Sequence, residues 1–240
     1  MRITRLFLAE PLAESTEVVL PAEASHYVLR VLRMHEGEPI IVFNGEGGEF
    51  HGVLHPQKNA AVVVITQFVP RDIESPVAIH LGQGISRGEK MDYVVQKAVE
   101  LGVAELTPLF TERCGVKMDE EKIEKRIQHW QKIAQSACEQ SQRNCVPRIH
   151  APQPLQAWLV ARTEQLKLLC HFEQKDNEKL TESYASCALL VGPEGGFTDE
   201  EISSAFTNQF QPFTLGPRVL RTETAAVAAL TKVQTLWGDI

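Results

Sequence analysis

The residues best suited to hold a ligand form a glycine-rich stretch in the last third of the 240-residue chain. Gly192-Pro-Glu-Gly-Gly196 directly follows Cys187-Ala-Leu-Leu-Val191, an apolar run that predicts a strand buried on both faces. Adjacent glycines let a ligand approach the main chain closely. Thr198 and Glu201 have the spacing of a capping box, which predicts a helix from Asp199. This order is typical of a ligand loop at the carboxyl edge of a parallel sheet, although an ordinary tight connection gives the same pattern.

The helix predicted after this loop begins with three acidic residues, Asp199, Glu200 and Glu201. Negative charge at a helix N-terminus opposes the binding of a phosphate there. We therefore expect an uncharged or cationic ligand rather than a pyrophosphate.

A second segment near the C-terminus brings two arginines into a turn. Residues 213–215 predict a short strand, Gly216-Pro217 interrupts it, and a helix is expected from Thr222. Arg218 and Arg221 lie in the turn between them. The small residues of 224–230 permit close packing, although the high helix propensity of alanine explains them equally well.

Strands alternate with helices after Pro76, which predicts a parallel α/β sheet. The expected strands are 77–81, 104–110 and 166–171, and the expected helices are 89–101 and 119–143. Residues 70–76 look like a linker. We therefore place one domain at 1–72 and a second at 73–240.

The first domain is predicted to be a small β-barrel with one helix. Strands are expected at 39–43, 49–54 and 60–66, with a glycine-rich turn between the first two. The helix is expected over 26–33, with Ser25 as its N-cap and Gly37 ending it.

Composition limits the classes of partner. The net charge of −7 argues against a broad basic surface that coats nucleic acid, so any RNA contact must be a local patch. No apolar run approaches the roughly 20 residues of a membrane helix, and we expect a cytoplasmic protein with no membrane partner. The five cysteines form no CxxC pair, which predicts reduced thiols and no metal site.

A nucleotide-dependent oxidoreductase is one alternative. Gly82-Gln-Gly84 follows a predicted strand, Gly88 lies beyond it, and Glu105 stands where a ribose-binding acid could fall. The third glycine is one position late for a dinucleotide-binding motif. This departure weakens the oxidoreductase hypothesis.

Two segments, Gly192-Pro-Glu-Gly-Gly-Phe-Thr198 and Leu215-Gly-Pro-Arg-Val-Leu-Arg-Thr-Glu-Thr-Ala225, together closely resemble the RsmE family of bacterial ribosomal RNA methyltransferases. Arg2, Arg5 and Phe7 and the segment His26-Tyr-Val-Leu-Arg-Val-Leu-Arg33 resemble the opening of that family, so the resemblance covers essentially the whole chain. It implies methylation of N3 of one uridine in 16S ribosomal RNA with S-adenosylmethionine. It also implies a PUA-like barrel, a SPOUT-type parallel sheet with a C-terminal trefoil knot, and a homodimer.

The resemblance also assigns site residues. Those expected to bind the cofactor are Gly192, Pro193, Glu194, Gly195, Gly196, Leu215, Gly216, Val219, Leu220 and Thr224. Arg221 is the first choice for stabilising negative charge on the uracil oxygens, because its guanidinium can donate two hydrogen bonds. Glu194 and Glu223 compete as the proton acceptor, although Glu223 also suits the first turn of a helix without any catalytic role.

Arg2, Arg5, Arg30 and Arg33 are the candidates for contact with RNA phosphates, although a solvated helix face explains them as well. The low basicity of the chain favours a structured RNA target such as the small ribosomal subunit, and we expect no DNA partner. A non-catalytic RNA-binding adaptor is the second alternative. Both loops and Arg221 argue against it.

Overall fold

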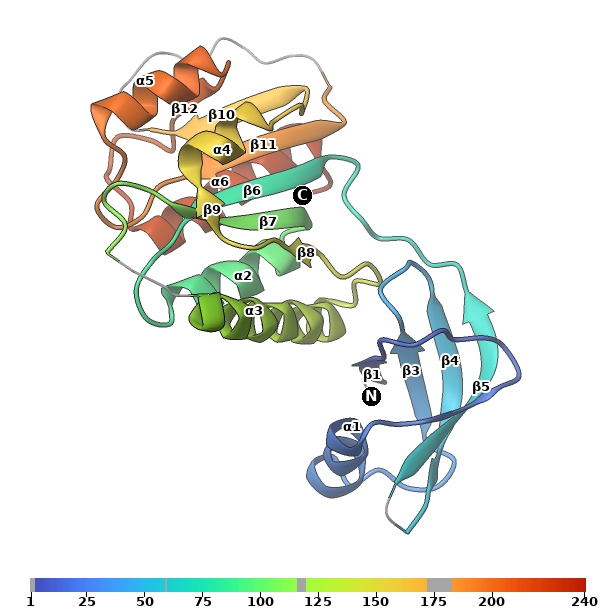
Figure 1. Cartoon of the computed structure of the whole chain (residues 1–240). Coiled ribbons are helices and arrows are strands. Elements are labelled where there is room, and N and C mark those ends of the chain that lie inside the picture. The colour runs from blue at the N-terminus through green and yellow to red at the C-terminus, as the bar shows by residue number, and fades with distance from the viewer. Residues whose placement is uncertain (1–2, 59, 116–119, 172–182) are drawn as a thin grey trace. The chain divides into compact units, whose positions relative to one another are not determined.

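A computed structural model describes residues 3–58, 60–115, 120–171 and 183–240. The chain divides into two compact units, the first formed by Met1–Glu74 with Cys138–Val146 and the second by Ser75–Ala137 with Pro147–Ile240 (Figure 1). The sequence analysis placed 138–146 in the second domain, whereas the structure groups this segment with the first unit. No helix in the described ranges is both long enough and apolar enough to cross a bilayer.

The first unit is built on a five-stranded sheet in the order β1-β3-β4-β5-β2. Its strands are β1 (Thr4–Phe7), β2 (Glu17–Val19), β3 (Pro39–Phe43), β4 (Glu49–Pro56) and β5 (Ala61–Val69). β1 pairs with β3 in parallel, and the other pairs are antiparallel. The three strands predicted from sequence are confirmed.

The helical segment of this unit differs from the expectation. Helix α1 (Ala22–His26) begins earlier than predicted and continues as one π-helical turn, Tyr27–Val31. The assignment of Ser25 as an N-cap is wrong, because Ser25 lies inside α1 and is buried. Its hydroxyl donates to the Leu20 carbonyl at 2.9 Å and accepts from the Ala61 amide at 3.1 Å, which ties the helix to the sheet.

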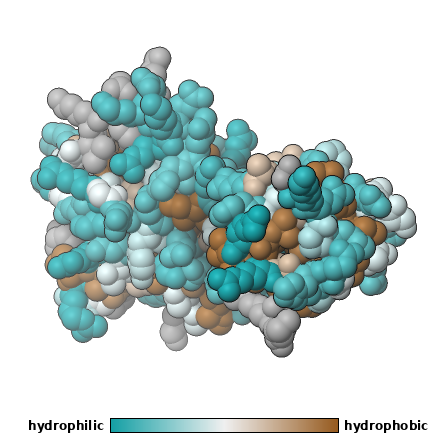
Figure 2. Space-filling view, turned by 90° about the horizontal axis from the view of Figure 1, so that it is seen from below, coloured by the Kyte–Doolittle hydropathy of each residue, from teal (hydrophilic) through white to brown (hydrophobic). Residues whose placement is uncertain are grey.

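The first unit also carries apolar side chains on its surface (Figure 2). The large apolar residues that are more than a third exposed there are Ile3, Val19, Tyr27, Val31, Leu32, Phe68 and Ile73. Three of them, Tyr27, Val31 and Leu32, lie in or next to the π-helical turn. This turn therefore combines apolar and basic surface, because Arg30 and Arg33 are exposed beside them.

The second unit contains a parallel sheet in the order β12-β10-β11-β6-β7-β8, with β9 paired to β7. Its strands are β6 (Ala78–Gly84), β7 (Val103–Phe110), β8 (Arg148–Ile149), β9 (Gln153–Pro154), β10 (Leu166–Cys170), β11 (Ser186–Val191) and β12 (Gln211–Phe213). The helices are α2 (Lys90–Glu100), α3 (Glu120–Ser141, whose last turn is grouped with the first unit), α4 (Leu155–Val160), α5 (Asp199–Thr207) and α6 (Thr222–Trp237). The predicted parallel α/β sheet is confirmed.

Helices cover both faces of this sheet (Figure 1). On one face, every second side chain of β10 and β11 packs against α4 and α5. Together they form an apolar core around the fully buried Trp158. Helix α6 packs against β11 and against α2 on the other face. A strand that is apolar on both faces, as β11 is, belongs in the middle of such a sandwich.

The strand order brings two loops together. β11 and β12 both pair with β10, so the loop that follows β11 (192–198) and the loop that follows β12 (214–221) leave the same edge of the sheet. β12 ends at Phe213, two residues before the predicted strand end at 215. The trefoil knot implied by the family resemblance stays a prediction.

Candidate functional site

A cavity of about 980 Å³ lies at the carboxyl ends of β10, β11 and β12. Nine of the ten residues assigned to the cofactor line it: Gly192, Pro193, Glu194, Gly195, Gly196, Leu215, Gly216, Val219 and Leu220. Thr224 is exposed and does not line the cavity, whereas Thr222 and Ala225 of the same helix do. Two segments about 20 residues apart in the sequence therefore form one site.

A buried glutamine connects the strands to the loops. Gln83 of β6 is fully buried, and its Nε2 donates to Thr222 Oγ1 at 2.9 Å. The Thr222 hydroxyl donates in turn to the Gly192 carbonyl at 2.5 Å. These bonds fix the start of α6 against the loop that follows β11.

Two glycines of the site have different roles. A Cβ on Gly195 would lie 2.8 Å from Arg113 Cβ, and Arg113 Nη1 donates to the Gly195 carbonyl at 3.2 Å. The lack of a side chain at Gly195 therefore leaves room for Arg113. Gly216 has a φ of +95°, and a Cβ there would meet nothing within 4 Å. At this second glycine the positive φ, which residues with a side chain rarely adopt, is what favours glycine.

Lys90 lies between the two candidate carboxylates. Its Nζ is 3.1 Å from Glu194 Oε1 and 3.8 Å from Glu223 Oε2. Partial burial raises the pKa of Glu194, but hydrogen bonds from the Arg87 and Glu194 amides and the Lys90 charge outweigh it, so the pKa lies below its ordinary value. Glu194 is therefore ionised at neutral pH.

Arg221 is exposed at the N-cap of α6 and lines the cavity. Its carbonyl accepts the Ala225 amide at 2.7 Å, which holds the backbone of the turn. Among the described residues, no carboxylate lies within 4.0 Å of its guanidinium. The positive charge is thus available to a molecule in the cavity. Glu223, the second candidate acid, does not line the cavity, and its Oε2 is buried.

The residues predicted to contact RNA divide into three cases. Arg2 lies outside the described residues. Arg30 and Arg33 are exposed on the first unit. Arg5 is buried, and its Nη1 forms a 2.6 Å ion pair with Glu49 while its Nη2 donates to Asn144 Oδ1. This arrangement corrects the expectation for Arg5, because a buried guanidinium already paired with a carboxylate cannot also reach a phosphate.

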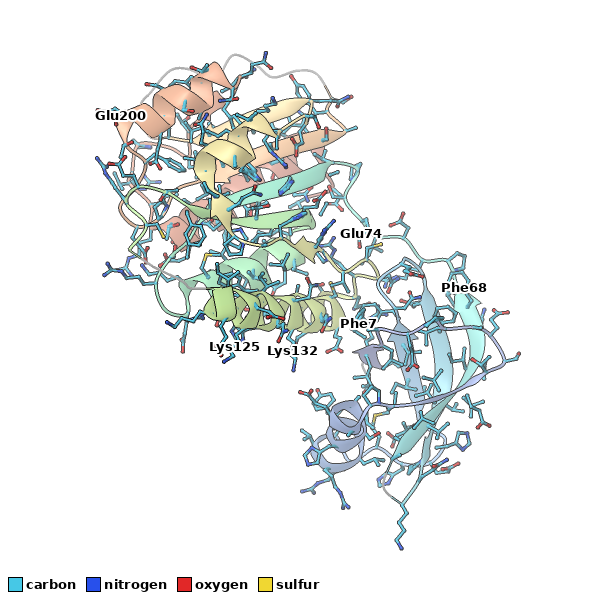
Figure 3. The ribbon with its side chains drawn as sticks, in the orientation of Figure 1. Phe7, Phe68, Glu74, Lys125, Lys132 and Glu200 are labelled. Carbon is cyan, nitrogen blue, oxygen red and sulfur yellow. The ribbon has the colours of Figure 1, made fainter. Side chains whose placement is uncertain are left out.

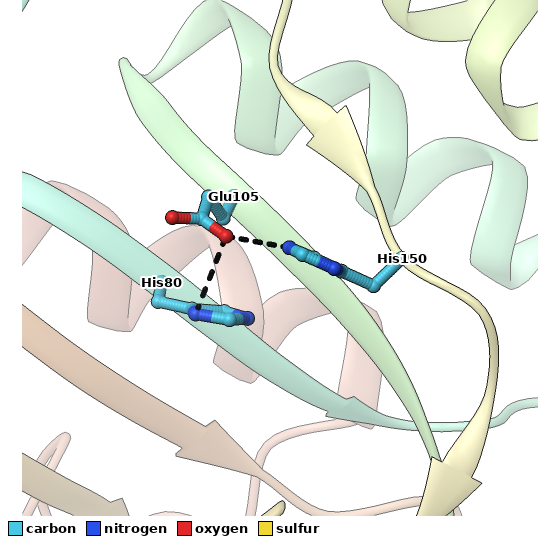
Figure 4. A group of neighbouring side chains, drawn as sticks. All are labelled: His80, Glu105 and His150. Carbon is cyan, nitrogen blue, oxygen red and sulfur yellow. Dashed lines mark hydrogen bonds and ion pairs between the residues drawn. The ribbon is translucent and has the colours of Figure 1, made fainter. Parts of the chain in front are cut away.

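A separate polar cluster lies on the face of the sheet that α4 covers (Figure 4). His150 Nε2 is 2.5 Å from Glu105 Oε2, and His80 Nδ1 is 3.8 Å from the same atom. The possible ligand atoms of His80, Glu105 and His150 lie within 4.8 Å of one another. Such a group could hold a divalent cation. Arg162, however, already donates to His80 Nδ1.

Both ring nitrogens of His80 have polar neighbours. Arg162 and Glu164 lie at Nδ1, and Thr107 Oγ1 is 2.7 Å from Nε2. Burial, together with the charge of Arg162, lowers the pKa of His80 against the opposing effects of Glu164 and Glu105. We interpret the cluster as a structural charge network, and the absence of a resident metal stays a prediction.

Comparisons with known proteins agree with this geometry. A family model described as an RNA methyltransferase domain matches residues 73–234, and an RNA methyltransferase PUA domain matches 20–66. Ribosomal RNA small subunit methyltransferase E of Buchnera aphidicola (subspecies Schizaphis graminum) is 36% identical, with all of this chain and 98% of the relative covered. The chain belongs to the ribosomal RNA small subunit methyltransferase E family.

Two solved structures support this membership. A methyltransferase from Legionella pneumophila with bound S-adenosylmethionine is 42% identical, covers both chains fully and has a TM-score of 0.94. Ribosomal RNA small subunit methyltransferase E from Neisseria gonorrhoeae, also bound to S-adenosylmethionine, is 39% identical, with full coverage and a TM-score of 0.91. The resemblance to the RsmE family is confirmed, as are the PUA-like first domain and the SPOUT-type second domain.

Several cavity residues of this family member were not predicted from the sequence. Lys90 and Arg113 come from α2 and from the segment after β7, far from both motifs. Thr222 was considered only as the start of a helix. The sequence signal that could have indicated its role in the site is a polar residue at the first position of α6.

The oxidoreductase alternative is wrong. Gly82 and Gly84 lie inside β6 rather than in a phosphate-binding turn. A Cβ on Gly82 would lie 2.6 Å from the Trp158 ring, and one on Gly84 would lie 2.5 Å from Pro193. Protein neighbours therefore fill the space that a dinucleotide would need.

Proposed function

We propose that this chain transfers the methyl group of S-adenosylmethionine to N3 of a specific uridine in 16S ribosomal RNA. The observation that carries the proposal is the single cavity lined by both motif loops and by Arg221. The solved relatives from Legionella and Neisseria carry S-adenosylmethionine, and the curated relatives are named as methyltransferases of small-subunit ribosomal RNA. Uridine N3 is the finer part of the proposal and rests on the family resemblance.

The cavity fits this cofactor. Its volume of about 980 Å³ lies at the upper end of the range for small-molecule sites. Leu215, Leu220 and Phe197 provide apolar walls, and the first turn of α5 supplies Asp199 rather than a phosphate cradle. A cationic ligand with apolar and polar parts suits such a lining. When bound, S-adenosylmethionine supplies an electrophilic methyl group.

The chemistry left to the protein concerns the uracil. N3 carries a proton and becomes a good nucleophile only when that proton leaves, so negative charge develops on the uracil oxygens. Arg221 can donate two hydrogen bonds to that charge from the cavity wall. The bond from the Ala225 amide to the Arg221 carbonyl holds the backbone of this residue at the N-cap of α6, beside the cavity.

Glu194 and Glu223 remain the two candidates for the proton acceptor. Glu194 lines the cavity and is ionised, but its lowered pKa makes it a weaker base. Glu223 does not line the cavity, and its Oε2 is buried and lies 3.8 Å from Lys90 Nζ. Comparing Glu194→Gln with Glu223→Gln distinguishes them, because only loss of the true acceptor should abolish the dependence of the rate on a group that titrates in acid.

The same proposal covers the partners. Arg30 and Arg33 are exposed on the PUA-like unit and, together with Arg2, are the remaining candidates for contact with RNA phosphates. The homodimer, which rests on the family resemblance, and the cytoplasmic location are likewise proposals. Analytical ultracentrifugation tests the dimer directly, and a monomer at micromolar concentration would contradict it.

The deciding experiment is methyl transfer from labelled S-adenosylmethionine to unmodified small ribosomal subunits and to naked 16S RNA. Mass spectrometry of the nucleosides then identifies the product. Labelled 3-methyluridine is the expected result. Label in another nucleoside would keep the cofactor and overturn the target. No transfer together with no binding of S-adenosylmethionine would overturn the enzyme and favour the adaptor.

A further inference from the structure

A second, smaller cavity of about 180 Å³ lies beside the first turn of α2. The loop after β6 contributes Ser86 and Arg87, α2 contributes Met91, and α3 contributes Arg126 and Trp130. Neither motif loop reaches it, and the proposed methyl transfer does not use it. Its distinctive feature is that two arginines, Arg87 and Arg126, line one small space.

These two arginines carry positive charge that the described protein does not neutralise. Arg87 and Arg126 are both exposed, and no described carboxylate lies within 4.0 Å of either guanidinium. In a chain with a net charge of −7, such a pair is not the result of a general excess of basic residues. Two unpaired guanidiniums in one cavity indicate a site for an anion with several oxygens, because the planar fork of arginine matches phosphate geometry.

The neighbouring acidic groups do not cancel this charge. Asp92 accepts Trp130 Nε1–H at 3.0 Å and is 2.8 Å from His129 Nε2. Glu194 accepts the Arg87 amide at 3.1 Å and pairs with Lys90. Glu89 is exposed at the N-cap of α2 and has no side-chain capping bond. Asp92 and Glu194 are therefore bonded to other protein groups, and Glu89 is exposed to solvent.

The second cavity adjoins the proposed reaction site. Lys90 lines the large cavity, and Met91, the next residue, lines the small one. The backbone of Arg87 is hydrogen-bonded to Glu194, a residue of the motif loop. The backbone of Arg87 therefore lies beside the motif loop that lines the large cavity.

We propose that the cavity lined by Arg87 and Arg126 binds a phosphate group of the RNA strand beside the target nucleotide. The inference rests on the proposed function for the identity of the ligand. It assigns part of RNA binding to the methyltransferase unit itself, in addition to the exposed arginines of the PUA-like unit. Phosphate contacts of this kind fix the position of a strand without reading its sequence.

The test is the double variant Arg87→Gln/Arg126→Gln, with binding of small ribosomal subunits measured over a range of salt concentrations. We expect the affinity for subunits to fall about tenfold at low salt, and the slope of log affinity against log salt to decrease by about two. The affinity for S-adenosylmethionine, measured by calorimetry, should stay unchanged. If the double variant does not fold, Arg126→Gln alone serves, with an expected decrease in slope of about one.

Lys125→Gln is the matched control. Lys125 precedes Arg126 on α3 (Figure 3) but is paired with Glu121 at 2.6 Å and does not line the cavity. Its loss should leave both affinity and slope nearly unchanged, because an exposed pair of this kind contributes little. An equal effect in Lys125→Gln and Arg126→Gln would overturn the proposal, since it would indicate a diffuse charge effect.

The outcomes separate this inference from the proposed function. If the native protein methylates subunits but the double variant retains its affinity and salt slope, the phosphate site is refuted and the enzyme stands. If the native protein transfers no methyl group, but the double variant binds subunits more weakly than the native protein does, the phosphate site stands and the proposed methyl transfer is refuted. Binding is measured without turnover, so each result is informative alone.

Discussion

Gln83 Nε2 lies 2.9 Å from Thr222 Oγ1, and this bond joins a central strand to the first residue of the last helix, 139 residues later in the chain. The same hydroxyl donates to the Gly192 carbonyl. One side chain thus connects three segments that meet at the cavity. The geometry of the site depends on this connection as much as on the two motifs.

Thr222→Val should weaken the binding of S-adenosylmethionine. The substitution keeps the shape of the side chain but removes the acceptor of the Gln83 amide at this position and the shorter of the two hydrogen bonds to the Gly192 carbonyl. Unmade buried hydrogen bonds cost about 1 to 3 kcal/mol, so we expect the dissociation constant to rise about tenfold. Thr231→Val is the control, because that hydroxyl bonds only to the Val227 carbonyl of its own helix. Equal effects of both substitutions in calorimetry would contradict a role in the cavity.

Arg221→Ala should lower turnover far more than cofactor binding. Removing a preorganised donor to developing charge typically costs about 10²-fold or more in kcat. The dissociation constant of S-adenosylmethionine should change by no more than about twofold, because the guanidinium is assigned to the uracil. Single-turnover methyl transfer and calorimetry measure the two quantities. Parallel losses in both would mean that Arg221 binds the cofactor instead.

Lys90→Gln should move the acid limb of the pH–rate profile to higher pH. Lys90 is among the groups that hold the pKa of Glu194 below its ordinary value. A carboxylate with a lowered pKa is active above that pKa and loses activity as the pH falls through it. Without the ammonium group the pKa rises, so the loss of activity should begin at a higher pH.

Lys97→Gln provides the control for this measurement. Lys97 lies on the same helix but pairs with Glu100 at 2.8 Å and does not line the cavity. Its profile should match that of the native protein. An unmoved acid limb in Lys90→Gln would contradict Glu194 as the group that must be ionised for the reaction.

The motif loops could be predicted from the sequence because their signals are local. The apolar run, the glycines and the capping box lie within about 15 residues, and the structure has β11, the turn and α5 in that order, with the capping box formed. Long-range partners left no such signal. Lys90 and Gln83 are more than 100 residues from Glu194 and Thr222, and only the strand order brings each pair together.

Arg5 shows why the remaining part of the prediction failed. A basic residue near the N-terminus is typical of an exposed position, and nothing local marks it as buried. Its partners Glu49 and Asn144 lie 44 and 139 residues away, and Asn144 belongs to a segment that joins the first unit from the middle of the chain. Charge pattern alone cannot distinguish a cation that is available to RNA from one already paired with a distant carboxylate.

The pair of Arg5 and Glu49 leads to a prediction for acid stability. Burial raises the pKa of Glu49, but hydrogen bonds from His51 and Arg5 and the charges of Arg5 and Arg71 outweigh it and lower the pKa to about 2. The unfolded chain binds this proton near its ordinary pKa of 4.5, so the ionised carboxylate stabilises the fold above that pH. The stabilisation is lost as the pH falls from about 4.5 toward 2.

In Glu49→Gln, the urea midpoint should be lower than in the native protein at pH 7, and it should fall less between pH 5 and pH 3. Glu10→Gln, at an exposed position of the same unit, should follow the native curve. An equal acid loss in Glu49→Gln and the native protein would show that other carboxylates dominate the acid unfolding of this unit.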